Sequence, residues 1–204
     1  TIPILLSGTK DYVGLAQTGT GKTAAFSLPL LNLLETADRF PQALILSPTR
    51  ELCIQIHKEI ENYSKYMREI RSVAVYGGTD IVRQIKEIKQ GVQIVVATPG
   101  RLIDLASRRA VDLSKIDYIV LDEADEMLNM GFKDALDEIL TYASNVKSTW
   151  LFSATMPREV RRIASSYMTD PEEVTCGTKN STNENIDHVY LLTEHRNRME
   201  TLQR

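Results

Sequence analysis

The chain is poor in cysteine and has no long apolar run. Cys53 and Cys176 are the only cysteines among 204 residues, and they lie in different neighbourhoods of the sequence. A disulfide framework would need more cysteines at closer spacing. The composition therefore predicts two free thiols in a reducing, cytoplasmic environment. No apolar stretch approaches the roughly 20 residues that a membrane-spanning helix requires, so no membrane association is expected.

An excess of basic residues is also missing. The formal net charge is −3, whereas domains that bind nucleic acid indiscriminately are usually strongly basic. This balance argues mildly against such binding, although a local strip of arginines and backbone N–H groups could still hold a nucleic acid. Hydrophobic residues at 43% and charged residues at 25% are typical of a folded globular domain.

No methionine opens the sequence, and its last residues, 188–204, stop inside a helical pattern. Both features predict a piece of a longer protein. Within it we expect a first domain over residues 1–175. The polar, turn-rich residues 176–186 predict a linker. Residues 187–204 are expected to start another domain, with a strand at 188–193 followed by a helix.

Short apolar runs alternate with longer helical patterns, which predicts an α/β domain with a mostly parallel sheet and helices on both faces. Strands are predicted at residues 12–16, 43–47, 73–76, 93–97, 118–121 and 149–152. Helices are predicted at residues 21–35, 49–67, 80–90, 99–108, 132–142 and 157–167.

A glycine-rich turn follows the first predicted strand and opens a helix. Glycines let successive backbone N–H groups point at a phosphate, and the helix dipole favours the same anion. Lys22 can reach the β- and γ-phosphates of a nucleotide, and Thr23 can ligate Mg²⁺. The alternative is a structural turn with an incidental lysine, which the strand–turn–helix context disfavours. Ala16 stands where the usual pattern has glycine, and the expected ATP-binding residues are Gln17, Thr18, Gly19, Thr20, Gly21, Lys22 and Thr23.

Two adjacent carboxylates follow a buried strand further along the chain. The carboxyl end of a parallel strand would place Asp122 beside the glycine-rich turn. Asp122 is expected to hold Mg²⁺ and Glu123 to position the attacking water, so Lys22, Asp122 and Glu123 form the candidate catalytic set. The alternative is an acidic first turn of a helix, which the dipole favours by itself.

These motifs resemble those of the DEAD-box RNA helicases. Residues 122–125 read Asp-Glu-Ala-Asp, and residues 16–23 resemble motif I of that family, in which alanine is normal at the first position. Further elements follow the family order: Pro-Thr-Arg-Glu-Leu at 48–52, Gly-Gly at 77–78, Thr-Pro-Gly-Arg at 98–101 and Ser-Ala-Thr at 153–155. The resemblance implies a RecA-like P-loop domain, the first of two that bind ATP and RNA between them.

The same resemblance implies roles for further residues. Asp125, Ser153 and Thr155 would couple nucleotide state to RNA binding through hydrogen bonds. Contacts to the sugar-phosphate backbone carry no base readout, so RNA binding independent of sequence is expected. The implied RNA contacts are Pro48, Thr49, Arg50, Gly77, Gly78, Thr98, Gly100 and Arg101.

The resemblance also implies what lies outside this stretch. The family's glutamine motif precedes motif I, and the second domain supplies arginines that stabilise the transferred phosphoryl group. We therefore expect a monomer that hydrolyses ATP very slowly without its second domain. Two alternatives stay open: a DNA-acting translocase of the same superfamily, and an ATP-gated RNA clamp that leaves the chemistry to partners.

Overall fold

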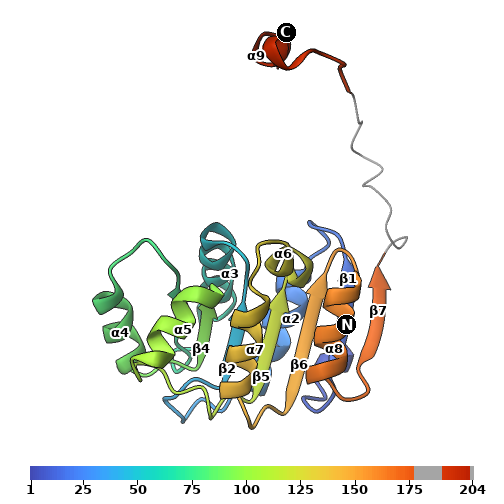
Figure 1. Ribbon diagram of the computed structural model, residues 1–204. Helices are drawn as coiled ribbons and strands as arrows, with labels where there is room; N and C mark the ends of the chain where they lie inside the picture. Colours follow the sequence, from blue (N-terminus) through green and yellow to red (C-terminus); the bar gives the residue numbers. More distant parts are fainter. Residues whose placement is uncertain (177–189, 203–204) are drawn as a thin grey trace.

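Seven parallel strands form one sheet in the computed structural model, which describes residues 1–176 and 190–202. The strand order is β3-β4-β2-β5-β6-β1-β7, and every neighbouring pair is parallel (Figure 1). The predicted fold class is confirmed. The strands are β1 (Tyr12–Ala16), β2 (Ala43–Leu46), β3 (Ser72–Val75), β4 (Ile94–Ala97), β5 (Tyr118–Asp122), β6 (Ser148–Ser153) and β7 (Glu172–Cys176).

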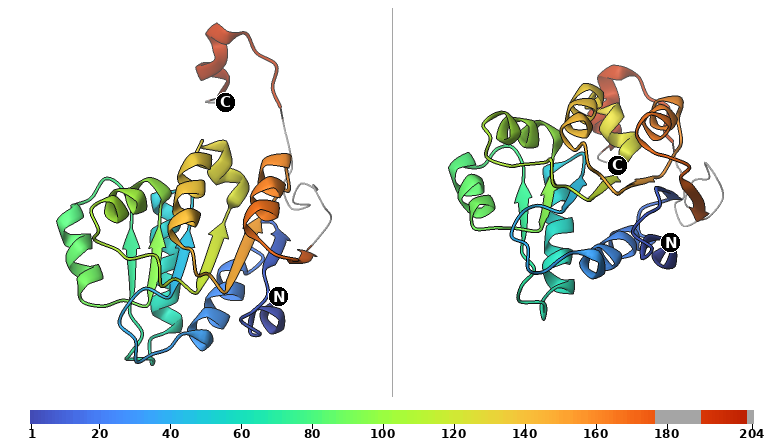
Figure 2. Two further views of the ribbon diagram at one scale, coloured as in Figure 1. Left: turned by 60° about the horizontal axis from the view of Figure 1, so that its bottom comes forward. Right: turned by 90° about the horizontal axis from the view of Figure 1, so that it is seen from below.

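Helices cover both faces of the sheet, as Figure 2 shows from two sides. One face carries α1 (Ile2–Leu5), α2 (Lys22–Leu33) and α3 (Arg50–Tyr63). The opposite face carries α4 (Ile81–Lys89), α5 (Pro99–Ser107), α6 (Ala124–Asn129), α7 (Lys133–Tyr142) and α8 (Arg158–Tyr167). Each helix buries an apolar stripe, so the sheet has a separate hydrophobic cluster on each side.

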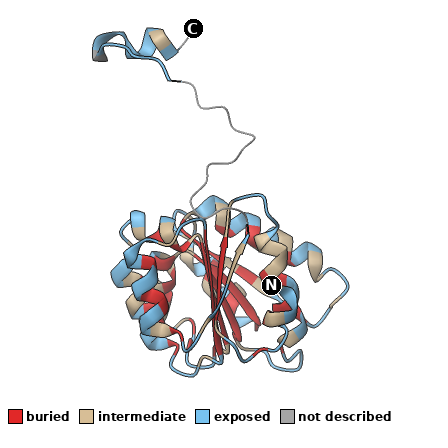
Figure 3. Cartoon of the chain, turned by 90° about the vertical axis from the view of Figure 1, so that its right-hand side faces the viewer, coloured by how far each residue is buried: buried red, intermediate tan, exposed pale blue. Residues whose placement is uncertain are grey.

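The central strands are buried on both faces because helices cover them on both sides. Side chains alternate along a strand, so Val13 joins the cluster under α4–α8, whereas Tyr12 joins the cluster under α1–α3. Figure 3 views the sheet along its edge, with the buried strands between two helical layers whose outer surfaces are exposed. This arrangement explains why the strands appear in the sequence as continuous apolar runs.

The structure contains two short elements that the sequence analysis did not predict, α1 and β7, and a third, α6, which has the acidic first turn that was considered there as an alternative. Strand β7 lies at the sheet edge and its residues are exposed or half-buried, so it has no apolar run to mark it. It pairs with β1, and its last residue Cys176 lies opposite Ala16. The predicted linker therefore began one residue too early, and residues 177–186 lie outside the described part of the chain.

Residues 190–202 form a short separate segment. The predicted strand at 188–193 is wrong for residues 190–193, which have no regular secondary structure, while 188 and 189 lie outside the described residues. A strand needs a neighbour to satisfy its backbone hydrogen bonds, and none pairs with this segment in the part of the chain described. The helical prediction is confirmed by η1 (His195–Asn197) and α9 (Arg198–Leu202).

The assignment of residues 187–204 to a second domain stays a prediction. Among residues 1–176 and 190–202, no helix is both long enough and apolar enough to cross a membrane.

Candidate nucleotide and RNA site

The glycine-rich turn connects the end of β1 to the start of α2. Gly19 and Gly21 have φ angles of 79° and 83°, in the left-handed region that glycine adopts most readily. The Thr20 hydroxyl donates to the Gln17 carbonyl at 2.7 Å, which closes the turn. Helix α2 has 12 residues and starts at Lys22, so its N-terminal N–H groups face the turn. A helix N-terminus behind a curled loop is an anion-binding arrangement.

The Lys22 side chain ends in a buried ammonium group. Its Nζ has no hydrogen-bond partner among the described residues. A buried unpaired charge is unfavourable unless an ionic ligand or counter-charge compensates it. Lys22 and Asp122 belong to segments that follow β1 and β5 at the same edge of the sheet, and the positive charge of Lys22 partly offsets the raised pKa of the Asp122 carboxyl group.

Asp122 ends β5 and is only 3% exposed. Burial raises its pKa to about 6, the positive charge of Lys22 opposes this shift, and the charges of Glu123 and Asp125 add to it. Its Oδ1 also accepts a hydrogen bond from the Glu123 N–H at 3.1 Å. The carboxylate is therefore shielded from water, beside a cation, at the carboxyl edge of the sheet.

Glu123 adopts a left-handed backbone conformation, with φ 53° and ψ 51°. For a residue other than glycine this conformation costs about 1 kcal/mol or more. It turns the chain directly from β5 into α6 at the top of the sheet in Figure 1. The strain therefore lies at one of the predicted catalytic residues.

Asp125 connects α6 to the segment that follows β6. Its Oδ2 accepts hydrogen bonds from the Thr155 N–H at 2.9 Å and the Thr155 hydroxyl at 2.6 Å, and its own N–H donates to Ser153 Oγ at 3.3 Å. Burial alone would raise the pKa of Asp125, but the hydrogen bonds from Thr155 and Ser153 outweigh it and hold the pKa below its usual value. The three predicted coupling residues thus form one network, although the coupling role stays a prediction.

The sheet order brings these segments together. Strands β1 and β5 both pair with β6, so the carboxyl ends of all three lie side by side. The glycine-rich turn follows β1, the Asp122–Asp125 segment follows β5, and the Ser153–Thr155 segment follows β6. Ligands of open α/β sheets bind outside this edge, where the strand order reverses.

Two of the predicted RNA-binding segments also meet. The Arg50 guanidinium carbon lies 5.0 Å from the centre of the Tyr76 ring, and Arg50 Nη1 is 3.3 Å from the position that a Cβ on Gly78 would take. Gly77 and Gly78 are exposed, as is Arg50, whereas Pro48 is buried. Thr49 caps α3 by accepting a hydrogen bond from the Leu52 N–H at 3.2 Å.

The third predicted RNA segment lies at the start of α5. Thr98 is the N-cap residue of this helix, and Gly100 is exposed. The Arg101 guanidinium donates to the Thr79 carbonyl at 3.2 Å from both Nη atoms, and to Gln84 Oε1 at 2.9 Å. Arg101 therefore holds the loop after β3, and its predicted contact to RNA stays untested.

Comparison with known proteins identifies the family of this chain. Residues 1–163 match the family described as DEAD/DEAH box helicase. The chain belongs to this family. It is 47% identical over 191 residues to an ATP-dependent RNA helicase DeaD of Mycobacterium tuberculosis, a match that covers 94% of this chain and 34% of the relative. It is 46% identical over its whole length to a DEAD-box ATP-dependent RNA helicase CshA of Bacillus cereus, 38% of which is covered.

Solved structures agree with this assignment. A hypothetical ATP-dependent RNA helicase from Sulfolobus tokodaii superposes with a TM-score of 0.80 at 43% identity, covering 86% of this chain and 50% of that one. A DEAD box protein from Methanococcus jannaschii gives a TM-score of 0.78 at 39% identity, covering 98% of this chain and 53% of that one. The DEAD-box chain described here spans about a third of the curated relatives' length, and it shares the RecA-like fold of the solved structures.

Sequence reasoning missed one residue that holds the loop after β3. Gln84 is 4% exposed, and its Nε2 donates to the Tyr76 carbonyl at 3.1 Å and to Thr79 Oγ1 at 3.0 Å. Together with Arg101 it fixes the loop that carries Gly77 and Gly78. A signal was present in the sequence, since Gln84 occupies an apolar-face position of α4 at helical spacing from Ile81 and Ile88.

The residues present fit a magnesium-nucleotide complex. Within the described residues, no group of three or more His, Cys, Asp or Glu side chains could hold a metal by itself. Mg²⁺ commonly binds through one or two carboxylates, with substrate phosphates and waters filling the other positions. The buried Asp122 carboxylate could bind the cation. The Lys22 ammonium, which has no hydrogen-bond partner among the described residues, could bind the phosphates.

Proposed function

We propose that this chain is the ATP-binding half of an ATP-dependent RNA helicase core. The observation that carries the proposal is that the glycine-rich turn with Lys22, the Asp122–Asp125 segment and its hydrogen bonds to Thr155 follow three adjacent strands at one edge of the sheet. The family membership and the RNA helicase names of its relatives support the same reading.

The nucleotide-binding step uses side chains and backbone together. The N–H groups of the glycine-rich turn and the Lys22 ammonium would hold the phosphates, and Thr23 with Asp122 would hold Mg²⁺. When bound, Mg²⁺ would neutralise charge that develops on the phosphates. The Glu123 carboxylate, which directly follows Asp122, would accept a hydrogen bond from the attacking water.

RNA would bind along the loops that follow β2, β3 and β4. The exposed Gly77-Gly78 pair lets backbone N–H groups approach phosphates, and Arg50 beside it offers a fork of charged donors. None of these groups reads a base, so we propose binding that does not depend on RNA sequence. The Asp125 network lies between the nucleotide side and this surface and would transmit nucleotide state.

A second RecA-like domain in the same polypeptide would complete the helicase core by supplying the arginines that this half lacks. The test is ATP turnover by the two-domain protein with single-stranded RNA and with DNA of equal length. RNA-stimulated turnover that is lost in Lys22→Ala is the expected result. Equal stimulation by DNA would favour a general translocase, and no stimulation by either would contradict the proposal.

A further inference from the structure

The sheet has an open edge at β3. The carbonyls of Arg71 and Val75 accept hydrogen bonds from the N–H groups of Ile94 at 3.2 Å and Thr98 at 2.9 Å, on the β4 side. Successive residues of a strand point their backbone groups in opposite directions, so Ser72 and Ala74 direct their N–H and C=O groups away from β4. No strand pairs with this side of β3 in the described part of the chain.

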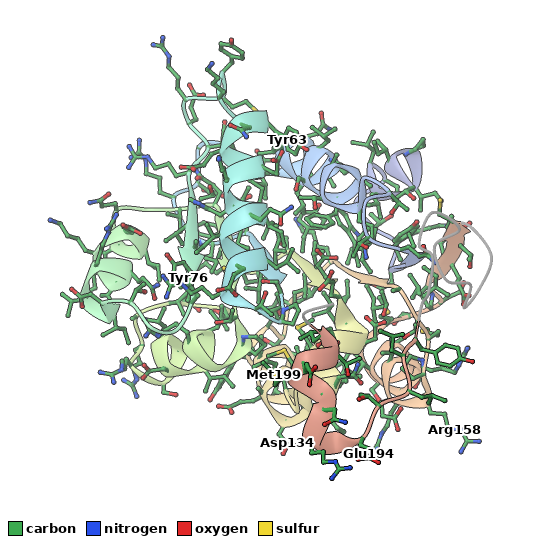
Figure 4. The ribbon with its side chains drawn as sticks, turned by 90° about the horizontal axis from the view of Figure 1, so that it is seen from above. Tyr63, Tyr76, Asp134, Arg158, Glu194 and Met199 are labelled. Carbon is green, nitrogen blue, oxygen red and sulfur yellow. The ribbon has the colours of Figure 1, made fainter. Side chains whose placement is uncertain are left out.

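A groove with a volume of about 880 Å³ follows this edge. Helix α3 packs on one face of the sheet and α4 on the other, so neither covers the edge between them. Figure 4 looks down on the carboxyl edge of the sheet, with Tyr76 between these two helices. Tyr76 lines the groove just after the end of β3. Ser72 and Ala74 form its floor and are half-buried, while α3 and α4 form its walls.

The amino-terminal end of the groove carries unpaired positive charge. Lys65, Arg68 and Arg71 line it just before β3 and are all exposed. Arg71 Nη1 reaches only the Gln90 carbonyl, at 3.5 Å. Across residues 1–176 and 190–202, none of these three side chains has a carboxylate oxygen within 4 Å of its charged nitrogens.

Of the acidic side chains that line the groove, only Glu87 pairs with an arginine or lysine among the described residues. Glu87 pairs with Arg83 at 2.9 Å, and Glu61 Oε2 lies 3.7 Å from His57 Nδ1. Asp80 caps α4 by accepting a hydrogen bond from the Val82 N–H at 2.8 Å. Glu61 can offset at most one of the three charges of Lys65, Arg68 and Arg71, so the amino-terminal end of the groove keeps an excess of positive charge.

We propose that this groove binds an extended acidic peptide of a partner protein, which adds to β3 as an eighth strand. An open strand edge offers alternating donors and acceptors, and a peptide backbone satisfies both kinds. The phosphates of a nucleic acid only accept hydrogen bonds, and the 2′-hydroxyls of RNA do not repeat the donor and acceptor spacing of a strand, so a peptide backbone matches Ser72 and Ala74 better. Acidic side chains of the peptide would meet Lys65, Arg68 and Arg71.

The experiment uses two fluorescent ten-residue probes on the 204-residue chain: alternating glutamate and valine, and alternating lysine and valine. The acidic probe is expected to bind at least about tenfold more tightly, since several charge pairs each contribute a few tenths to 1 kcal/mol. Amide exchange at Ser72 and Ala74 should slow when it binds. Equal affinity for both probes, or unchanged exchange at these two amides, would overturn the proposal.

Two variants separate the backbone contribution from the charge contribution. Ala74→Pro removes an outward N–H, which an edge strand tolerates, and should abolish binding while far-ultraviolet circular dichroism stays unchanged. Arg68→Glu with Arg71→Glu should weaken the acidic probe at least about tenfold, whereas Arg161→Glu on α8 should not. If a ten-nucleotide oligouridylate displaces the probe and itself depends on Arg68 and Arg71, the groove is an RNA surface and the peptide assignment is wrong.

Discussion

At the scale of single residues, the site brings a buried cation and a buried carboxylate together without a direct hydrogen bond between them. Lys22 Nζ has no partner in the part of the chain described, and Asp122 has a pKa raised to about 6. Neither side chain gains much from its surroundings in the protein alone. In the proposed function both bind ionic groups of a ligand, so their substitution should affect binding more than folding.

Lys22→Ala is expected to weaken nucleotide binding about tenfold to a hundredfold, because one or two charge-assisted hydrogen bonds to phosphate are lost. The midpoint of urea unfolding should stay equal or rise, since a buried unpaired charge is removed. Equilibrium titration with a fluorescent ATP analogue measures the first effect. Lys115→Ala, whose ammonium lies over the Phe40 ring, serves as the matched control and should bind normally.

Magnesium-dependent nucleotide affinity should fall as the pH drops through about 6. An acid is protonated below its pKa, so the Asp122 carboxylate that would hold Mg²⁺ is lost in that range. We expect up to about a tenfold loss of affinity per pH unit below pH 6. Titrations between pH 7.5 and 5 measure it. In Asp122→Asn the affinity should be weak and nearly flat with pH, and a wild-type slope in that variant would assign the titration to another group.

At the scale of elements, the segment after β6 is tied to α6 through one carboxylate. Thr155→Val removes the 2.6 Å hydroxyl hydrogen bond to Asp125. We expect a loss of about 1–2 kcal/mol in the free energy of unfolding, because the acceptor is charged and partly buried. Urea denaturation measures it. Thr141→Val is the control, since its exposed hydroxyl donates only to the Asp137 carbonyl within α7 and its loss should have little effect.

The loop after β3 depends on the side chain of Gln84. Gln84→Leu keeps the size of this buried side chain but removes its hydrogen bonds to Tyr76, Thr79 and Arg101. The free energy of unfolding should fall by about 1–3 kcal/mol because buried polar groups lose partners. Amide exchange across residues 76–80 should become faster, and RNA affinity weaker. The exposed Gln90→Leu is the control, and an equal change there would argue against a specific role for Gln84.

At the scale of the whole molecule, the proposed helicase binds ATP and RNA in a cleft between two domains. This chain would form one side of that cleft, and the second domain would form the other. An arginine finger contributes about 10³ to 10⁵ in rate to phosphoryl transfer. The 204-residue chain alone should therefore bind nucleotide weakly and show no RNA-stimulated ATP hydrolysis. Steady-state turnover with and without RNA measures this. Brisk stimulated turnover by the chain alone would mean that the catalytic set is complete without a partner domain.

The local pattern of the sequence was enough to predict strands β1 to β6 and the six long helices. Strands buried on both faces must be apolar throughout, and surface helices must repeat apolar residues at helical spacing. The positions of Lys22, Asp122 and Thr155 in segments at or just after strand ends also followed from the sequence, because parallel strands end at a common edge. These features depend on residues that are close together in the sequence, so short stretches of sequence are enough to predict them.

Only the tertiary structure decided the features that depend on distant residues. Strand β7 has no apolar run and exists because β1 offers an edge to pair with. The orientation of Arg101 toward Thr79 and Gln84 depends on how α4 and α5 pack beside the same loop. The shared environment of Lys22 and Asp122 depends on β6 lying between β1 and β5. Spacing along the chain does not encode these contacts, because they arise only when the sheet order places separate strand ends together.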